Sequence, residues 1–314
     1  MNLDENRDLI QRICIVVPTY NRADILEKSL AMYSEILYIS EANILIIDNN
    51  STDRTKEVVR EFKKKHQLNV EYYFESQQGL SIAKNTAISI CKQDYMLFLD
   101  DDCYPQRDIL VKCLDSLLLP NTFILGKVKR WNEMVPAWIE DDFFIRNPES
   151  DTRTMLKDTS QVKGCILLIE RNVFHIINGF NTLLGMNGTK IAYGEDTELG
   201  YRAKSLGIDI WYDSSIAMYH RSHFMTVGEF LKKNYLAGQT HQSLRVKKKG
   251  IFRLLALVCY HLFKSPFIFL SYITKSANWK GAFVASLSKV SNYTGQLIFQ
   301  LKSTVQSLTG HSAL

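Results

Sequence analysis

The six cysteines of this 314-residue chain form no C-x-x-C pair. Their scattered positions give no sign of a zinc site or a disulfide framework, so we expect a protein of a reducing compartment. Residues 1–11 also lack an apolar core and include three acidic residues, which argues against a secretory signal peptide. The chain is therefore expected to stay in the cytoplasm or on the cytoplasmic face of a membrane.

Acidic residues are nearly missing from residue 221 onward. Only Glu229 of the 33 acidic residues lies there, against 13 of the 38 lysines and arginines. The basic residues come without a recognisable nucleic-acid-binding motif, so no nucleic-acid partner is expected. The C-terminal part therefore has surroundings different from those of the remainder of the chain.

The same part lacks an uninterrupted apolar run of the length that crosses a bilayer, which is about 20 residues. Lys264 and Ser265 divide two apolar stretches, 251–263 and 266–273. The basic cluster 245–249 directly precedes them and is of the kind attracted to anionic membrane surfaces. We expect peripheral attachment to the cytoplasmic face of the plasma membrane. An apolar helix packed on the remainder of the protein, with solvated lysines, and an embedded hairpin are the alternatives.

Strand and helix patterns alternate over the first hundred residues. Short apolar runs bounded by turn residues predict buried strands, and helical spacing of apolar residues predicts helices between them. Such alternation indicates right-handed crossovers and a mostly parallel central sheet flanked by helices, with ligands bound beyond the carboxyl ends of its strands. The predicted strands are 13–17, 44–47, 70–74 and 95–99, and the helices are 22–36, 52–66 and 80–91.

The apolar run 95–99 ends abruptly in three carboxylates, Asp100, Asp101 and Asp102. Stacked negative charge at the end of a buried strand is costly unless a cation neutralises it. Mg²⁺ and Mn²⁺ prefer carboxylate oxygens and usually also bind a substrate phosphate. This segment therefore predicts a divalent metal and a phosphate-bearing substrate.

Five segments, in their order and spacing, resemble glycosyltransferase family 2 with its GT-A fold. The resemblance covers about residues 12–220 and implies an α/β nucleotide-diphospho-sugar transferase fold with a C-terminal helical extension. The segments are Val16–Arg22, Ile47–Asp53, Gly79–Asn85, Phe98–Asp102 and Gly194–Leu199.

The resemblance also implies a domain organisation. The catalytic domain would span residues 1–225, with a nucleotide-binding half at 12–102 and an acceptor half at 103–225. Residues 226–314 would form the basic, apolar helical region.

The resemblance assigns donor-binding roles to the first three segments. Pro18, Thr19 and Arg22 would form the loop that touches the nucleoside, and Asp48 would accept a hydrogen bond from the base. An Asx turn or helix cap is the alternative for Asp48. Lys84 would contact the nucleotide or its diphosphate, although the family often has arginine there, and a solvated helix charge is the alternative.

The carboxylate segment corresponds to the family's D-x-D motif. Asp102 would bind the metal, Mn²⁺ or Mg²⁺, and Asp100 would lie nearer the ribose or a metal-bound water. Asp101 belongs to the same nucleotide-binding motif, but strand alternation turns it the other way, toward a structural role. His220, or alternatively His223, would complete the metal site.

The resemblance identifies Asp196 as the catalytic base that removes the acceptor hydroxyl proton. Glu195 would contact the acceptor or support the loop. Helix capping is the alternative for such a pair in a first helical turn. Trp131 and Trp138 are candidates to stack on the acceptor sugar, with a packing role as the alternative.

These residues together predict an inverting, metal-dependent transferase of the hexosyltransferase type. It would move a sugar from a nucleotide-diphospho-sugar, with uridine the expected nucleoside, to a saccharide or lipid-linked saccharide in cell-surface glycan synthesis. A processive polysaccharide synthase is the nearest alternative. It would carry several long apolar membrane spans and a Gln-x-x-Arg-Trp motif, whereas no Arg-Trp follows residues 239–242 here. A nucleotidyltransferase would need a glycine-rich loop at 16–21, which has no glycine. A non-catalytic nucleotide-sugar-binding protein would lack the acidic site residues, whereas Asp100, Asp102 and Asp196 are all present in this chain.

Overall fold

The computed structural model describes residues 3–131, 136, 138, 139, 153–157, 159, 162, 164–187, 193–221, 226–244, 248–273 and 279–309. The chain divides into two compact units. The first draws on residues 1–131, 145–190 and 195–221, and the second on 132–144, 191–194 and 222–314.

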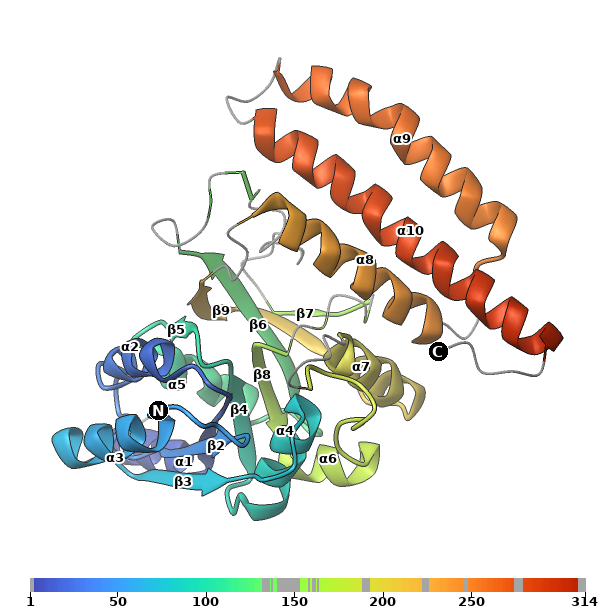
Figure 1. The fold of residues 1–314 in the computed structure, drawn as a ribbon. Coiled ribbons are helices and arrows are strands. Elements are labelled where there is room, and N and C mark those ends of the chain that lie inside the picture. The colour runs from blue at the N-terminus through green and yellow to red at the C-terminus, as the bar shows by residue number, and fades with distance from the viewer. Residues whose placement is uncertain are drawn as a thin grey trace. The chain divides into compact units, whose positions relative to one another are not determined.

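The first unit holds all the described strands (Figure 1). Its elements are α1 (Leu3–Gln11), β1 (Ile13–Thr19), α2 (Ala23–Tyr33), β2 (Asn43–Asp48), α3 (Thr55–His66), β3 (Val70–Phe74), α4 (Leu80–Ile90), β4 (Tyr95–Leu99), β5 (Cys103–Pro105), α5 (Ile109–Cys113), η1 (Leu114–Ser116), β6 (Phe123–Arg130), β7 (Thr154–Met155), β8 (Ile166–Glu170), α6 (Arg171–Ile177), α7 (Glu195–Ser205) and β9 (Trp211–His220).

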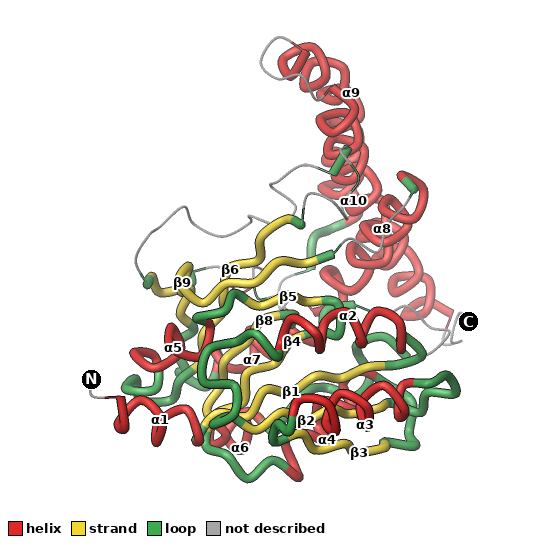
Figure 2. Tube along the Cα trace, turned by 90° about the vertical axis from the view of Figure 1, so that its left-hand side faces the viewer, coloured by secondary structure: helices red, strands yellow, loops and turns green. Residues whose placement is uncertain are grey.

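These strands form one mixed sheet in the order β3-β2-β1-β4-β8-β6-β9-β5, with β7 paired to β9 (Figure 2). The predicted parallel pairing holds from β3 to β4, where helices connect successive strands. Beyond β4 the sheet departs from a mostly parallel one, because β8 runs antiparallel to both β4 and β6. The α/β fold with flanking helices is confirmed.

The continuous apolar runs form the central strands of the sheet. Their side chains are apolar on both faces because both faces of the sheet are covered there. Every residue of β1 and of β4 is buried. On one face, Cys14 and Val16 lie in a cluster with Phe98, whose ring centroid is 5.6 Å from that of Phe174 and 5.7 Å from that of Phe180. This packing fixes the strand ends that carry the polar segments.

The strand register brings distant polar residues to one edge of the sheet. Thr19 at the end of β1 lies opposite Asp48 at the end of β2. Cys103 in β5 lies opposite His220 in β9, although more than a hundred residues separate them in sequence. The edge predicted to bind ligands therefore also receives residues from the end of the first unit.

The second unit contains α8 (Val227–Leu244), α9 (Ile251–Ile273) and α10 (Trp279–Thr309), and α10 runs alongside each of the other two (Figure 1). Glycines allow α8 and α10 to cross closely. A Cβ on Gly238 would lie 2.0 Å from the Asn292 carbonyl oxygen, and one on Gly295 would lie 2.0 Å from the Tyr235 carbonyl oxygen. Within the described part of the chain, none of the helices is both long and apolar enough to cross a membrane.

Candidate active site

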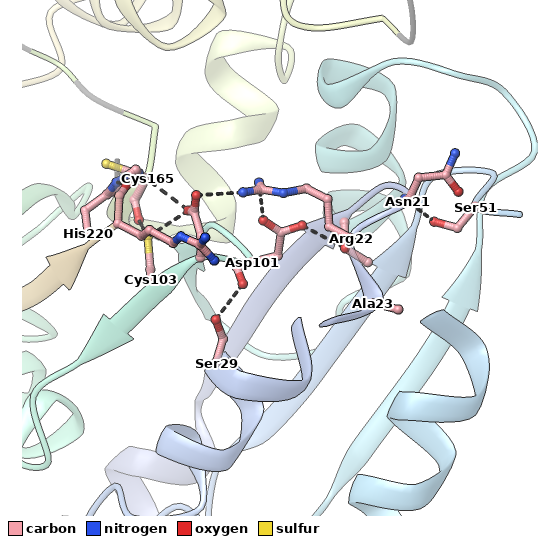
Figure 3. Close-up of polar contacts among 12 residues, drawn as sticks. Asn21, Arg22, Ala23, Ser29, Ser51, Asp101, Cys103, Cys165 and His220 are labelled. Atoms are coloured by element: carbon pink, nitrogen blue, oxygen red, sulfur yellow. Dashed lines mark hydrogen bonds and ion pairs between the residues drawn. The ribbon is translucent and has the colours of Figure 1, made fainter. Parts of the chain in front are cut away.

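An arginine clamp holds two buried aspartates among the three that follow β4. Arg22, just before α2, places Nη1 2.5 Å from Asp101 Oδ1 and Nη2 2.9 Å from Asp102 Oδ2 (Figure 3). Thr19 donates its hydroxyl hydrogen to Asp101 Oδ2 at 2.8 Å, and Ser29 donates to the Asp101 carbonyl at 2.5 Å. Burial raises the pKa of Asp101 to about 7, and the charge of Arg22 opposes this rise.

This arrangement bears on two predicted nucleotide contacts. Arg22 was expected in the nucleoside loop, and the structure pairs it with carboxylates through both ends of its guanidinium. Asp101 is 3% exposed, and Thr19 and Arg22 contact its two carboxylate oxygens. Direct nucleotide contact by either residue stays a prediction.

Two of the three aspartates also belong to a cluster of side chains that could hold a cation. Among the described residues, Asp100, Asp102, Cys103 and His220 place one ligand atom each within 4.8 Å of one another. His220 Nε2 is 3.5 Å from Asp102 Oδ1, and Nδ1 contacts the Arg221 carbonyl oxygen. A hydrogen on Nδ1, donated to that carbonyl, leaves the Nε2 lone pair for a metal.

Two carboxylates and an imidazole suit Mn²⁺ or Mg²⁺ in donor chemistry, so the residues fit the predicted divalent cation. The alternative ligand, His223, lies outside the described residues.

Lys84 is the cation between this cluster and the predicted base. It is 1% exposed, with Nζ 3.3 Å from Glu195 Oε1 and 5.0 Å from the centroid of the Phe180 ring. Burial favours a lower pKa for Lys84, but the charges of Glu195, Asp100 and Asp196 outweigh it and raise the pKa. The alternative of a solvated helix charge is wrong, whereas contact with a diphosphate stays a prediction.

The carboxylates around Lys84 are less stable in their charged form than they would be in water. Burial raises the pKa of Asp100 and of Glu195, and the positive charge of Lys84 opposes the rise in both. The site thus concentrates negative charge that one buried lysine only partly balances, which suits it to a cationic ligand.

Asp196 is held by the backbone at the start of α7. Its Oδ2 accepts the Gly164 N–H at 2.6 Å, and its Oδ1 accepts the Thr197 N–H at 2.8 Å. A Cβ at Gly164 would lie 2.8 Å from Lys84 Nζ and 3.3 Å from Asp196 Cβ, so a larger residue there would displace one of these two side chains. The predicted base is therefore oriented by two main-chain donors, one from beside β8 and one from its own helix.

Asp48 stabilises the turn after β2 by a bond to the residue three positions on, rather than the residue two positions on that defines an Asx turn. Its Oδ1 accepts the Ser51 N–H at 2.9 Å and its Oδ2 accepts the Tyr72 hydroxyl at 2.6 Å. Burial and then the neighbouring Asp48 raise the pKa of Tyr72. Each carboxylate oxygen has a second lone pair, so contact with a base stays a prediction. Pro18 pairs with Ile47 in the strand register beside it.

The two tryptophans predicted for the acceptor belong to different units. Trp131 lies with its ring centroid 4.3 Å from that of Tyr104 and 5.8 Å from that of Tyr219. Trp138 packs at 5.7 Å from Phe230. Both are half-buried, so the packing role is present, and stacking on a sugar stays a prediction.

Two residues of the site were not singled out from the sequence. Asn49 accepts the Gly79 N–H and donates to the Gln77 carbonyl, both at 2.8 Å, and so fixes the start of α4 that carries Lys84. Cys103 contributes its sulfur to the cluster of possible ligands. Only their positions in the sequence could have indicated these two residues, because Asn49 follows Asp48 and Cys103 follows Asp102.

Comparisons with known proteins agree with this geometry. The family model for glycosyl transferase family 2 matches residues 14–175. Glycosyltransferase AglE of Haloferax volcanii is 23% identical over 313 residues, which cover 94% of this chain and 98% of AglE.

Two solved structures share the fold. The mannosyltransferase PcManGT of Pyrobaculum calidifontis, in complex with GDP-Man and Mn²⁺, matches with a TM-score of 0.58 and 17% identity, over 95% of this chain and 87% of that one. Residues 1–349 of S. aureus TarS, in complex with UDP-GlcNAc, match with a TM-score of 0.52 and 15% identity, over 89% and 90%. These likenesses confirm the expected GT-A fold. The family model covers more than half of the sequence, and the chain is therefore a member of glycosyltransferase family 2.

Proposed function

We propose that this glycosyltransferase moves a sugar from a nucleotide-diphospho-sugar to a hydroxyl of a saccharide or lipid-linked saccharide, with inversion at the anomeric carbon. The observation that carries the proposal is the placing of two carboxylate groups around one buried cation. Lys84 Nζ and Asp196 both lie beside Gly164, and the charge of Asp100 also raises the pKa of Lys84, so the possible metal cluster and the backbone-held aspartate belong to one site. Inverting transfer needs a stabilised leaving group and a separate base.

The donor side uses Asp100, Asp102 and His220. A divalent cation held there would neutralise charge on the diphosphate leaving group as a Lewis acid. Arg22 keeps Asp102 in place through Oδ2, while Oδ1 faces His220. Asp48, buried at the end of β2, is the proposed acceptor of a base N–H. The structural neighbours were solved with GDP-Man and UDP-GlcNAc, and we propose a uridine donor for this chain.

The acceptor side uses Asp196 as general base. Its carboxylate would take the proton from the acceptor hydroxyl as that oxygen attacks the anomeric carbon. The Gly164 and Thr197 N–H groups keep the carboxylate oriented for this transfer. Glu195 is occupied by Lys84, so we assign it to support of the site rather than to acceptor contact.

The second unit supports attachment to an anionic membrane surface. Helix α9 exposes a stripe of apolar side chains at helical spacing, in which Phe252 is 88%, Phe263 79% and Phe267 70% exposed. Arg253 and Lys264 are exposed at one rim of this stripe. An amphipathic helix with a basic rim binds the interface of anionic bilayers. A lipid-linked acceptor would be reached from that position.

Transfer assays test the proposed reaction. The purified full chain is incubated with UDP-sugars and GDP-Man, with Mn²⁺ or Mg²⁺, and with saccharide and lipid-linked acceptors, and product configuration is read by NMR. Asp196→Asn should lose about 10²–10⁴-fold in turnover, because the acceptor proton has no base. Glu198→Gln, which removes a carboxylate paired with Arg202 on the same helix, is the matched control. Wild-type turnover in Asp196→Asn would refute the assignment.

Vesicle sedimentation tests the membrane surface. The wild type should bind vesicles that contain anionic lipid and bind neutral ones weakly. Phe263→Ser with Phe267→Ser should weaken binding at least tenfold, since a buried Phe contributes about 1.5–3 kcal/mol. Phe74→Ser, at an exposed site in β3, is the matched control and should bind like the wild type. Equal binding by all three proteins would contradict the role of α9.

A further inference from the structure

One thiol of the first unit lies within the possible metal cluster but has no part in the proposed transfer. Cys103 follows Asp102 directly and begins β5, and its side chain is fully buried. Its Sγ is 3.9 Å from Asp102 Oδ1 and 3.7 Å from the Cys165 carbonyl oxygen. Figure 3 shows Cys103 and His220 gathered at one end of the network that starts at Arg22.

The register of the sheet explains why this sulfur faces the cluster. Cys103 and His220 are direct partners across the β5–β9 pair, so both side chains point to the same face. The ligand atoms of Asp100, Asp102, Cys103 and His220 all lie within 4.8 Å of one another. The set contains two oxygen donors, one nitrogen and one sulfur.

Sulfur changes which metals such a set prefers. Mn²⁺ and Mg²⁺ favour oxygen, whereas thiolate and imidazole together favour zinc and cobalt. Four protein ligands would satisfy the four-coordinate geometry usual for zinc and would leave no position open to substrate. A metal binds the thiolate rather than the thiol, so binding at Cys103 would release its proton.

We propose that Cys103 Sγ is a ligand of this site and that the site binds zinc or cobalt(II) in competition with Mn²⁺ or Mg²⁺. On binding, the S–H bond breaks, a metal–sulfur bond forms and the proton leaves to solvent. Because four protein ligands occupy the metal, zinc excludes the diphosphate oxygens and inhibits transfer. The inhibition rests on the proposed function, but the metal–sulfur bond does not.

Cobalt titration of the full chain tests the bond without an activity assay. The wild type should develop a thiolate-to-cobalt charge-transfer band that saturates with one cobalt per chain, and Cys103→Ser should lose it. Cys259→Ser, which removes an exposed thiol from α9, is the matched control and should keep it. A wild type without the band, or a Cys103→Ser protein that keeps it, overturns the proposal.

X-ray absorption of the zinc-loaded wild type tests the bond independently of any variant. A sulfur neighbour at about 2.3 Å supports the proposal, and a shell of nitrogen and oxygen alone overturns it. In transfer assays with Mn²⁺, Cys103→Ser should need at least about tenfold more zinc for half inhibition than the wild type. Equal inhibition overturns the closed site. A protein that shows the sulfur bond but transfers no sugar refutes the proposed function and leaves this inference standing.

Discussion

Charged side chains are treated differently in the two units of this chain. In the first unit, Lys84 and Asp102 are buried, and each is paired with an opposite charge. In the second unit, Arg253 and Lys264 are exposed beside apolar side chains that are also exposed. A buried ion is costly without its partner, whereas an exposed one contributes little to folding. In the first unit, these buried charges hold the side chains of the site in place. In the second unit, the exposed charges remain available to contact an anionic membrane surface.

The largest expected effect comes from breaking the buried pair. Lys84→Met should lower the free energy of unfolding by about 3–5 kcal/mol, because Glu195 is left buried without its cation. Urea unfolding followed by circular dichroism measures the loss. The double variant with Glu195→Gln should recover most of it. If Lys84→Met were as stable as the wild type, the buried Lys84–Glu195 pair would not contribute to the free energy of unfolding as expected.

Arg22→Lys keeps the positive charge and removes the fork that reaches two carboxylates at once. We expect a loss of about 2 kcal/mol in the free energy of unfolding. Metal affinity, measured by calorimetry, should fall about 10–100-fold, because Asp102 loses the contact that orients it. Lys28→Arg, on the exposed face of α2, serves as the control for exchange between these residue types. Unchanged affinity in Arg22→Lys would contradict the clamp.

Exposed apolar residues of α9 should behave in the opposite way. Phe263→Ser is expected to change the free energy of unfolding by less than about 0.5 kcal/mol, since the side chain is 79% exposed and packs little. Leu254→Ser, a change to a fully buried residue of the same helix, should cost several times more. If both substitutions destabilised the protein equally, the stripe would be part of the folded core rather than a free surface.

The smallest expected effect concerns His261 in the second unit. Burial, and then the charges of Lys289, Lys264 and Lys249, lower its pKa. The unfolded chain therefore binds a proton more readily, so stability should be full above pH of about 6.5 and fall as the pH drops toward the lowered value. Comparison of the melting temperatures of wild type and His261→Gln across this range isolates the effect. Parallel curves for the two proteins would exclude it.

Secondary structure near the site followed closely from local sequence. The predicted strands 70–74 and 95–99 match β3 and β4, and β1 and β2 are each longer than predicted by two residues. Continuous apolar runs bounded by polar residues leave little choice of structure. Helix ends were less accurate, and α2 is Ala23–Tyr33 where 22–36 was expected, because the final turn depends on packing.

Local patterns could not show which charges would be buried. Lys84 stands in an ordinary helical pattern, and its burial comes from Phe180 and Glu195, about a hundred residues away. Arg22 and Asp101 are likewise joined by the neighbouring strands β1 and β4 rather than by sequence spacing. Contacts of this kind depend on the order of the strands in the sheet, which the sequence pattern did not predict.

The sequence by itself determined the family, the parallel strands and the group of polar residues at their ends, since apolar runs and motif order are local properties. Tertiary structure alone decided that Arg22 clamps Asp101 and Asp102, that Gly164 orients Asp196, and that Cys103 faces His220. The reason is physical. A buried charge needs a partner, and folding can supply that partner from any strand that the register brings alongside.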